Sequence, residues 1–137
     1  MRFEGKVLRS GRWWAVEVPI LGVATQGRTK RGALEMVKDA VELLADVDGF
    51  VVDVHPGSGQ HFEIGSANEA VLIALLLRRQ RQLHGLSLAE VSERLGRKSR
   101  NAYARFEQGK AMPTIAKLLE LLKVVGPERD FVLKESA

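Results

Sequence analysis

The sequence predicts an α+β protein in two parts, a small antiparallel sheet with one packed helix and then an all-helical half. From Arg2 to Leu8 hydrophobic and polar residues alternate loosely, which is the period of a strand. From Ala33 to Leu44 and from Ile115 to Val125 hydrophobic residues recur at three- and four-residue spacing, which is the period of a helix. We therefore expect two domains, residues 1–65 and residues 66–137.

A hairpin opens the first half. The segments 2–8 and 13–18 are expected strands, and Ser10-Gly11-Arg12 is the turn between them. The first strand places Phe3, Gly5 and Val7 on one face, and Pro19 ends the second strand.

A helix follows, with Thr29 as its N-cap and Gly49 as its stop signal. Its hydrophobic stripe, which must lie on the sheet, consists of Ala33, Met36, Val37, Ala40, Val41 and Leu44. A third strand is expected over 50–55 and a fourth over 61–64, joined by the turn-forming segment 56–60. The expected order of elements is ββαββ.

The second half opens with a helix that runs to Leu83, and Ser66 and Glu69 form its expected capping box. This helix is apolar on nearly every side between residues 71 and 77. Its surplus apolar surface must be covered by the first half or by another subunit, and the sequence leaves both open. The residues concerned are Val71, Leu72 and Leu75.

The last expected helix is capped by Thr114 and ended by Gly126-Pro127. Its inward residues are expected to be Ile115, Leu118, Leu119, Leu122 and Val125. In the tail, the apolar segment 131–133 either docks on a neighbour or adds a minor part to the core.

Between these two helices, residues 77–113 have the pattern of a helix-turn-helix. Ser87 and Glu90 form a capping box, and Ser92 and Gly96 supply the small residue and the turn that such a unit needs. Tyr103 and Phe106 are expected to anchor the following helix, which starts at Ser99 or Arg100, in the core. The residues left facing outward are Arg100, Asn101, Arg105 and Gln108.

Positive charge is concentrated on this segment. Residues 1–66 hold 8 Lys and Arg against 9 Asp and Glu, residues 67–137 hold 13 against 8, and residues 78–110 alone hold 9 against 3. A basic surface on a patterned helix-turn-helix favours DNA binding over the alternative, an ordinary solvated helical face. The expected DNA-binding residues are Ser87, Arg97, Lys98, Ser99, Arg100, Asn101, Arg105, Gln108 and Lys110.

Roles can be assigned within this set. Asn101 can both donate to and accept from an adenine edge, and the forked guanidinium of Arg100 suits guanine. The remaining basic residues mostly position the protein on phosphates. A solvated charge at Arg100 and a helix-start role for Asn101 remain the alternatives.

Two resemblances cover nearly the whole chain. The second half resembles the XRE/Cro-type helix-turn-helix family in the segments 77–79, 83–87, 91–96, 106–110 and 112–114. It departs from that family at Leu88, where a phosphate-binding glutamine is common, and by one extra residue between Gly96 and Ser99.

The first half resembles the HicB antitoxin domain in the segments 15–19, 22–27, 29, 33–35 and 39–43. The resemblance implies a partial ribonuclease-H-like fold in a type II toxin–antitoxin antitoxin. Such a protein holds a small HicA-type ribonuclease toxin inactive through its first domain and represses the shared operon through its second. The alternative is a stand-alone helix-turn-helix regulator whose first domain serves oligomerisation or ligand sensing.

Other classes of protein are disfavoured. The chain has no cysteine, so disulfides and thiolate metal sites are excluded, and its longest apolar segment, 71–77, is too short to span a membrane. The N-terminus lacks the apolar run of a secretory signal, so we expect a soluble cytoplasmic protein. We expect no enzyme, no cofactor and no metal, and a homodimer or homotetramer on a near-palindromic operator.

One cluster favours a different hypothesis. Asp53 and His55 face His61 and Glu63 across a turn, where strand alternation can bring two imidazoles and two carboxylates onto one face. A metal or catalytic site is one explanation, and an exposed polar hairpin is the other.

Overall fold

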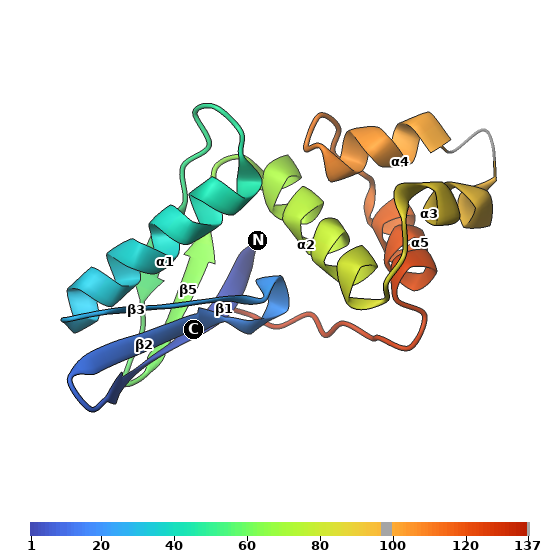
Figure 1. Ribbon diagram of the computed structural model, residues 1–137. Helices are drawn as coiled ribbons and strands as arrows, with labels where there is room; N and C mark the ends of the chain where they lie inside the picture. The colour runs from blue at the N-terminus through green and yellow to red at the C-terminus, as the bar shows by residue number, and fades with distance from the viewer. Residues whose placement is uncertain (97–99, 137) are drawn as a thin grey trace. The chain divides into compact units, whose positions relative to one another are not determined.

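A computed structural model describes residues 1–96 and 100–136, and the side chain of Arg100 lies outside that description. The chain divides into two compact units (Figure 1). Unit 1 comprises Met1–Glu69 together with Ser136 near the chain end, and unit 2 comprises Ala70–Glu135. The α+β class is confirmed, with an antiparallel sheet and one packed helix followed by a helical unit.

Unit 1 is a five-stranded antiparallel sheet in the order β3-β2-β1-β5-β4, with helix α1 packed on one face (Figure 1). The strands are β1 Arg2–Ser10, β2 Trp13–Val18, β3 Val23–Gly27, β4 Asp53–Pro56 and β5 His61–Gly65, and α1 is Lys30–Ala45.

The predicted hairpin is present, because β1 and β2 pair around Gly11, whose φ of 61° suits a residue without a Cβ. Val7 lies opposite Val16 on the buried face, where each is at most 2% exposed.

Helix α1 is capped as predicted, since the Thr29 hydroxyl accepts a 2.9 Å hydrogen bond from the Gly32 amide. The residues that it buries recur every four positions, and they are Ala33, Val37, Val41 and Ala45. The prediction that Met36 and Leu44 face the sheet was wrong, because each precedes a buried position by one residue, about 100° around the helix. The helix also ends before Gly49, because Asp46 takes the left-handed conformation with φ 51°.

The predicted ββαββ order was wrong by one strand. Val23–Gly27 forms β3, whose small and polar residues give a weak strand signal and whose pairing with β2 is visible only in three dimensions. The strand predicted over 50–55 is shorter and later: β4 is Asp53–Pro56, and Phe50 and Val52 are buried in the segment before it.

The helices of unit 2 are α3 Leu88–Leu95, α4 Arg100–Glu107 and α5 Ile115–Val125, together with α2, Glu69–Leu83, whose first residue still belongs to unit 1. Every residue from Val71 to Leu77 is buried. Part of the cover comes from within unit 2, because a Cβ on Gly109 would lie 2.8 Å from Val71 Cγ2. Position 109, in the turn after α4, therefore requires glycine. Its φ of 72° also favours a residue without a Cβ.

Two predictions about helices of this region were wrong. Glu69 is the first residue of α2, so it cannot form a capping box with Ser66, whose hydroxyl instead donates to Val51 O at 2.7 Å. In α5, Ile115 and Leu119 are 80% and 54% exposed, because each lies one residue past the stripe that contacts the core. That buried stripe consists of Leu121, Leu122 and Val125.

In the tail after α5, Val132 and Leu133 are 91% and 104% exposed, whereas Phe131 is 37% exposed and thus partly covered. Ser136 returns to unit 1, where its hydroxyl donates to the Glu63 carboxylate at 2.5 Å. Within the described part of the chain, the helices are too short or too polar to cross a lipid bilayer.

Candidate nucleic-acid interface

Helix α3 and the turn after it follow from local sequence. The Ser87 hydroxyl accepts from the Glu90 amide at 3.1 Å, and the Glu90 carboxylate accepts from the Ser87 amide at 3.2 Å, so both halves of the capping box are present. Ser92 is buried and donates to Leu88 O at 2.8 Å. Gly96 ends the helix with φ 81°, a conformation that strains other residues.

Helix α4 has a buried side and an exposed side. Tyr103 is 1% exposed and Phe106 is half-buried, which places the two predicted anchors toward the core. On the other side, two residues predicted to contact DNA are exposed, namely Asn101 and Arg105, and Gln108 and Lys110 are exposed in the following turn. The helix begins at Arg100, one of the two predicted starting points.

The remaining predicted residues fall into two groups. Ser87 is exposed, and although its oxygen accepts the capping bond, its hydroxyl proton stays available to a phosphate. Arg97, Lys98 and Ser99 lie outside the described residues.

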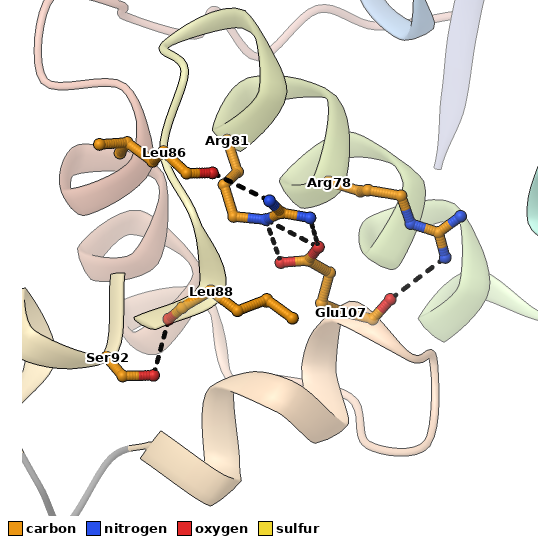
Figure 2. A network of polar contacts seen from close by, with 6 residues as sticks. All are labelled: Arg78, Arg81, Leu86, Leu88, Ser92 and Glu107. Atoms are coloured by element: carbon orange, nitrogen blue, oxygen red, sulfur yellow. Dashed lines mark hydrogen bonds and ion pairs between the residues drawn. The ribbon is translucent and has the colours of Figure 1, made fainter. Parts of the chain in front are cut away.

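A buried ion pair holds α4 in place (Figure 2). Arg81 of α2 makes a forked contact with the Glu107 carboxylate, with Nη2–Oε1 at 2.6 Å and Nε–Oε1 at 2.9 Å. Arg81 Nη1 also donates to Leu86 O at 2.9 Å. The two side chains are only 16% and 7% exposed. One guanidinium thus ties the end of α4 to α2 and to the segment that leads into α3.

This environment shifts two pKa values. The hydrogen bond to Glu107 raises the pKa of Arg81, against the opposing effect of burial. Burial raises the pKa of Tyr103 well above its ordinary value, and the neighbouring Glu107 carboxylate adds to the increase. The Tyr103 phenol is therefore neutral in the folded protein at neutral pH.

Sequence reasoning did not identify Arg81 and Glu107 as the residues that position α4. In the sequence, Arg81 is one of nine basic residues within 78–110, and Glu107 is part of the segment that resembles the helix-turn-helix family. A signal was present, because Glu107 is the single acidic residue between Glu93 and Glu120 in a basic segment. An isolated carboxylate one position after an apolar anchor is a candidate for a buried partner.

The acidic and histidine cluster of unit 1 is a polar sheet surface. His55 lies opposite Glu63 in the β4–β5 register, so the predicted sharing of one face is confirmed. Glu63 accepts hydrogen bonds from Ser136 and Arg2. Both bonds lower the pKa of the Glu63 carboxyl, and the bond from Ser136 has the larger effect. Among the residues that the structure describes, no three His, Cys, Asp or Glu side chains are grouped to hold a metal ion.

The comparisons with known proteins agree with the geometry of unit 2. Residues 77–129 match the helix-turn-helix family model. No curated protein matches the chain. The chain therefore carries a helix-turn-helix domain of the XRE/Cro type, a class of domain that binds DNA and regulates transcription. The match does not extend to residues 1–76, so the resemblance of the first half to HicB stays a prediction.

Proposed function

We propose that this protein is an antitoxin of the HicB type that represses its own operon and holds a small HicA-type ribonuclease toxin inactive, without being an enzyme itself. The observation that carries the DNA-binding part is the outward face of α4, where Asn101 and Arg105 are exposed, with Gln108 exposed directly after the helix. The ion pair of Arg81 with Glu107 holds this helix from its buried side. The toxin-binding part rests on the resemblance of the first half and on the surface of α1.

On DNA, α4 acts as the recognition helix in the major groove. Asn101 pairs with adenine through its amide, and Arg100 pairs with guanine through its forked guanidinium. Arg105, Lys110 and the Ser87 hydroxyl contact phosphates, together with the segment 97–99. Because Leu88 is 48% exposed and apolar at the start of α3, it supplies no polar phosphate contact there.

Association of two copies is part of the proposal, since one such unit contacts few base pairs. Met112, Ile115 and Leu119 are 54%, 80% and 54% exposed, and they recur at three- and four-residue spacing at and before α5. An apolar stripe of this kind supports a two-fold dimer, which would bind half-sites ~34 Å apart or a multiple of that distance.

For the toxin, α1 offers an apolar stripe between carboxylates. Met36 and Leu43 are 46% and 80% exposed at seven-residue spacing, and Val47, just past the end of α1, is 37% exposed. Asp39 is exposed one turn from Met36 on the same side of the helix, and Asp46 is exposed at its C-terminal end. A surface with apolar anchors and negative charge is complementary to a small basic protein.

A direct test is co-expression of the full chain with the neighbouring reading frame. We expect a small basic protein to copurify with the wild-type chain and its growth inhibition to be relieved. Leu43→Glu should abolish both effects, because it places a charge on the most exposed apolar residue of α1, while the exposed control Glu35→Gln should retain both.

If no such partner copurifies and the wild-type chain still binds its promoter, the alternative is the better description. That alternative is a stand-alone regulator whose unit 1 serves oligomerisation or ligand sensing. It is favoured by the confinement of the family match to residues 77–129.

A further inference from the structure

Charge is distributed unevenly along unit 1. Residues 5–31 hold six Lys and Arg but one acidic residue, Glu17, whereas residues 32–63 hold one Lys and seven acidic residues. All of these residues precede the helix-turn-helix segment, so this separation of charge is a property of unit 1 itself. The six basic residues are Lys6, Arg9, Arg12, Arg28, Lys30 and Arg31.

The sheet topology gathers most of these residues at one end of unit 1. Arg9 lies opposite Trp14, and Trp14 lies opposite Gly27, so one row crosses β1, β2 and β3. Arg12 is in the turn just beyond this row, and Arg28 directly follows Gly27. Figure 1 shows the β1–β2 hairpin, the end of β3 and the start of α1 at the same end of the unit.

An exposed aromatic ring lies within this basic end. Trp13 is 40% exposed, and the Arg28 guanidinium carbon lies 5.8 Å from the centre of its ring. This distance is that of a cation–π contact, which holds the guanidinium over one face of the ring without neutralising its charge. The only acidic residue among residues 5–31, Glu17, is opposite Lys6 at the far end of β2.

Trp13 lies on the face of the sheet opposite to α1. Its alternation partners Ala15 and Glu17 share that face, whereas Val16 and Val18 are buried beneath the helix. Leu8 lies opposite Ala15 on the same face and is 37% exposed. The surface around Trp13 is therefore a sheet face with short and apolar side chains, bordered by arginines.

We propose that this surface, formed by Trp13, Arg28 and Arg12, binds single-stranded nucleic acid. An exposed ring stacks on an unpaired base, and the surrounding guanidinium groups contact the phosphates on either side. A duplex keeps its base faces stacked internally, so it can use the charges but not the ring. The proposal is independent of α4 and of the toxin.

Binding is measured by fluorescence anisotropy of a labelled oligonucleotide of about 12 nucleotides, in oligo-U and oligo-dT forms, with the full-length protein. Quenching of intrinsic tryptophan emission reports the site, because Trp13 and Trp14 are the only tryptophans of the chain. We expect quenching on binding and an affinity that falls as salt rises. A preference for oligo-U would identify RNA as the ligand. Equal binding of the two oligonucleotides, or a preference for oligo-dT, would include single-stranded DNA among the ligands. Each of these results supports the proposal.

The variants separate the site from overall charge. Trp13→Ala and Arg28→Glu should each weaken binding roughly tenfold. Arg129→Glu makes the same charge change on an exposed residue of the tail and should bind like wild type, as should Arg105→Glu in α4. Unchanged melting temperatures show that the variants are folded.

Three results would overturn the proposal: no binding of either oligonucleotide, equal weakening by Arg129→Glu, or equally strong competition by a random-sequence duplex. Since Arg105→Glu removes an operator contact and spares this site, failure of operator binding and failure of the present proposal are distinguishable.

Discussion

The ion pair of Arg81 and Glu107 positions α4, although neither side chain belongs to the exposed face of that helix. Both side chains are largely buried, and their forked contact joins α4 to α2. A buried pair of this kind gains little over an apolar pair, but removal of one partner leaves an uncompensated charge. The pair therefore specifies where α4 lies more than it adds to overall stability.

Glu107→Ala should lower the free energy of unfolding by about 3–5 kcal/mol, because it leaves the Arg81 guanidinium buried without its partner. The double variant Arg81→Met/Glu107→Met should recover most of this loss. Urea denaturation followed by circular dichroism measures both. A double variant as unstable as the single one would show that the ion pair itself, and not the burial of a lone charge, supplies the stability.

Tyr103 gives a prediction for alkaline pH. In the unfolded chain its phenol ionises near pH ~10, whereas burial and Glu107 raise its pKa in the folded chain. Above about pH 10 the unfolded state binds fewer protons than the folded state, so the free energy of unfolding decreases as pH rises further.

Tyr103→Phe should show a smaller decrease over this range. Tyr103 is the only tyrosine of the chain, so tyrosinate absorbance reports on it alone and should appear together with unfolding. Tyrosinate absorbance in a chain that is still folded near pH ~10 would contradict the burial of this phenol.

At the scale of elements, features that depend on neighbouring residues could be predicted from the sequence. Thr29, Ser87 and Thr114 each cap a helix as expected, because a cap is a contact between a side chain and an amide three residues later. Strand β3 could not be predicted, because Val23–Gly27 is a strand only through its pairing with β2.

The candidate site divides in the same way. The exposure of Asn101, Arg105 and Gln108 follows from helical spacing around Tyr103 and was accessible to sequence analysis. The contact of Arg81 with Glu107 joins residues 26 positions apart, and spacing within one helix carries no information about it. The prediction of which α5 residues face the core was wrong for a related reason. Several apolar stripes fit the α5 sequence, and packing selects one of them.

The exposed stripe of α5 leads to a prediction about association. Ile115→Glu combined with Leu119→Glu should convert a dimer into a monomer, because it places charges on the two outward apolar residues of α5. Size-exclusion chromatography with light scattering measures the mass. Lys123→Glu, an exposed change later in the same helix, is the matched control. A double variant that keeps the wild-type mass would place the contact between copies elsewhere.

At the scale of the whole molecule, the chain combines a DNA-binding unit with a sheet unit whose surface is divided by charge. The acidic C-terminal part of α1 suits a basic protein, and the basic end around Trp13 suits a nucleic acid. Because these surfaces belong to different residues, we expect that each proposed function can be removed without the others. The helix-turn-helix of residues 77–129 is the part of the chain that a family model matches, and it carries the proposed recognition helix.

The most direct measurement of that claim is a gel-shift titration of the purified protein on its own promoter at low ionic strength. Wild type and the exposed control Gln82→Ala should bind alike. Arg100→Ala and Asn101→Ala should each weaken specific binding by about 1–3 kcal/mol with unchanged melting temperatures. A wild-type protein that does not bind the promoter, or two α4 variants that bind it as tightly as wild type, would contradict the assignment of α4 as the recognition helix.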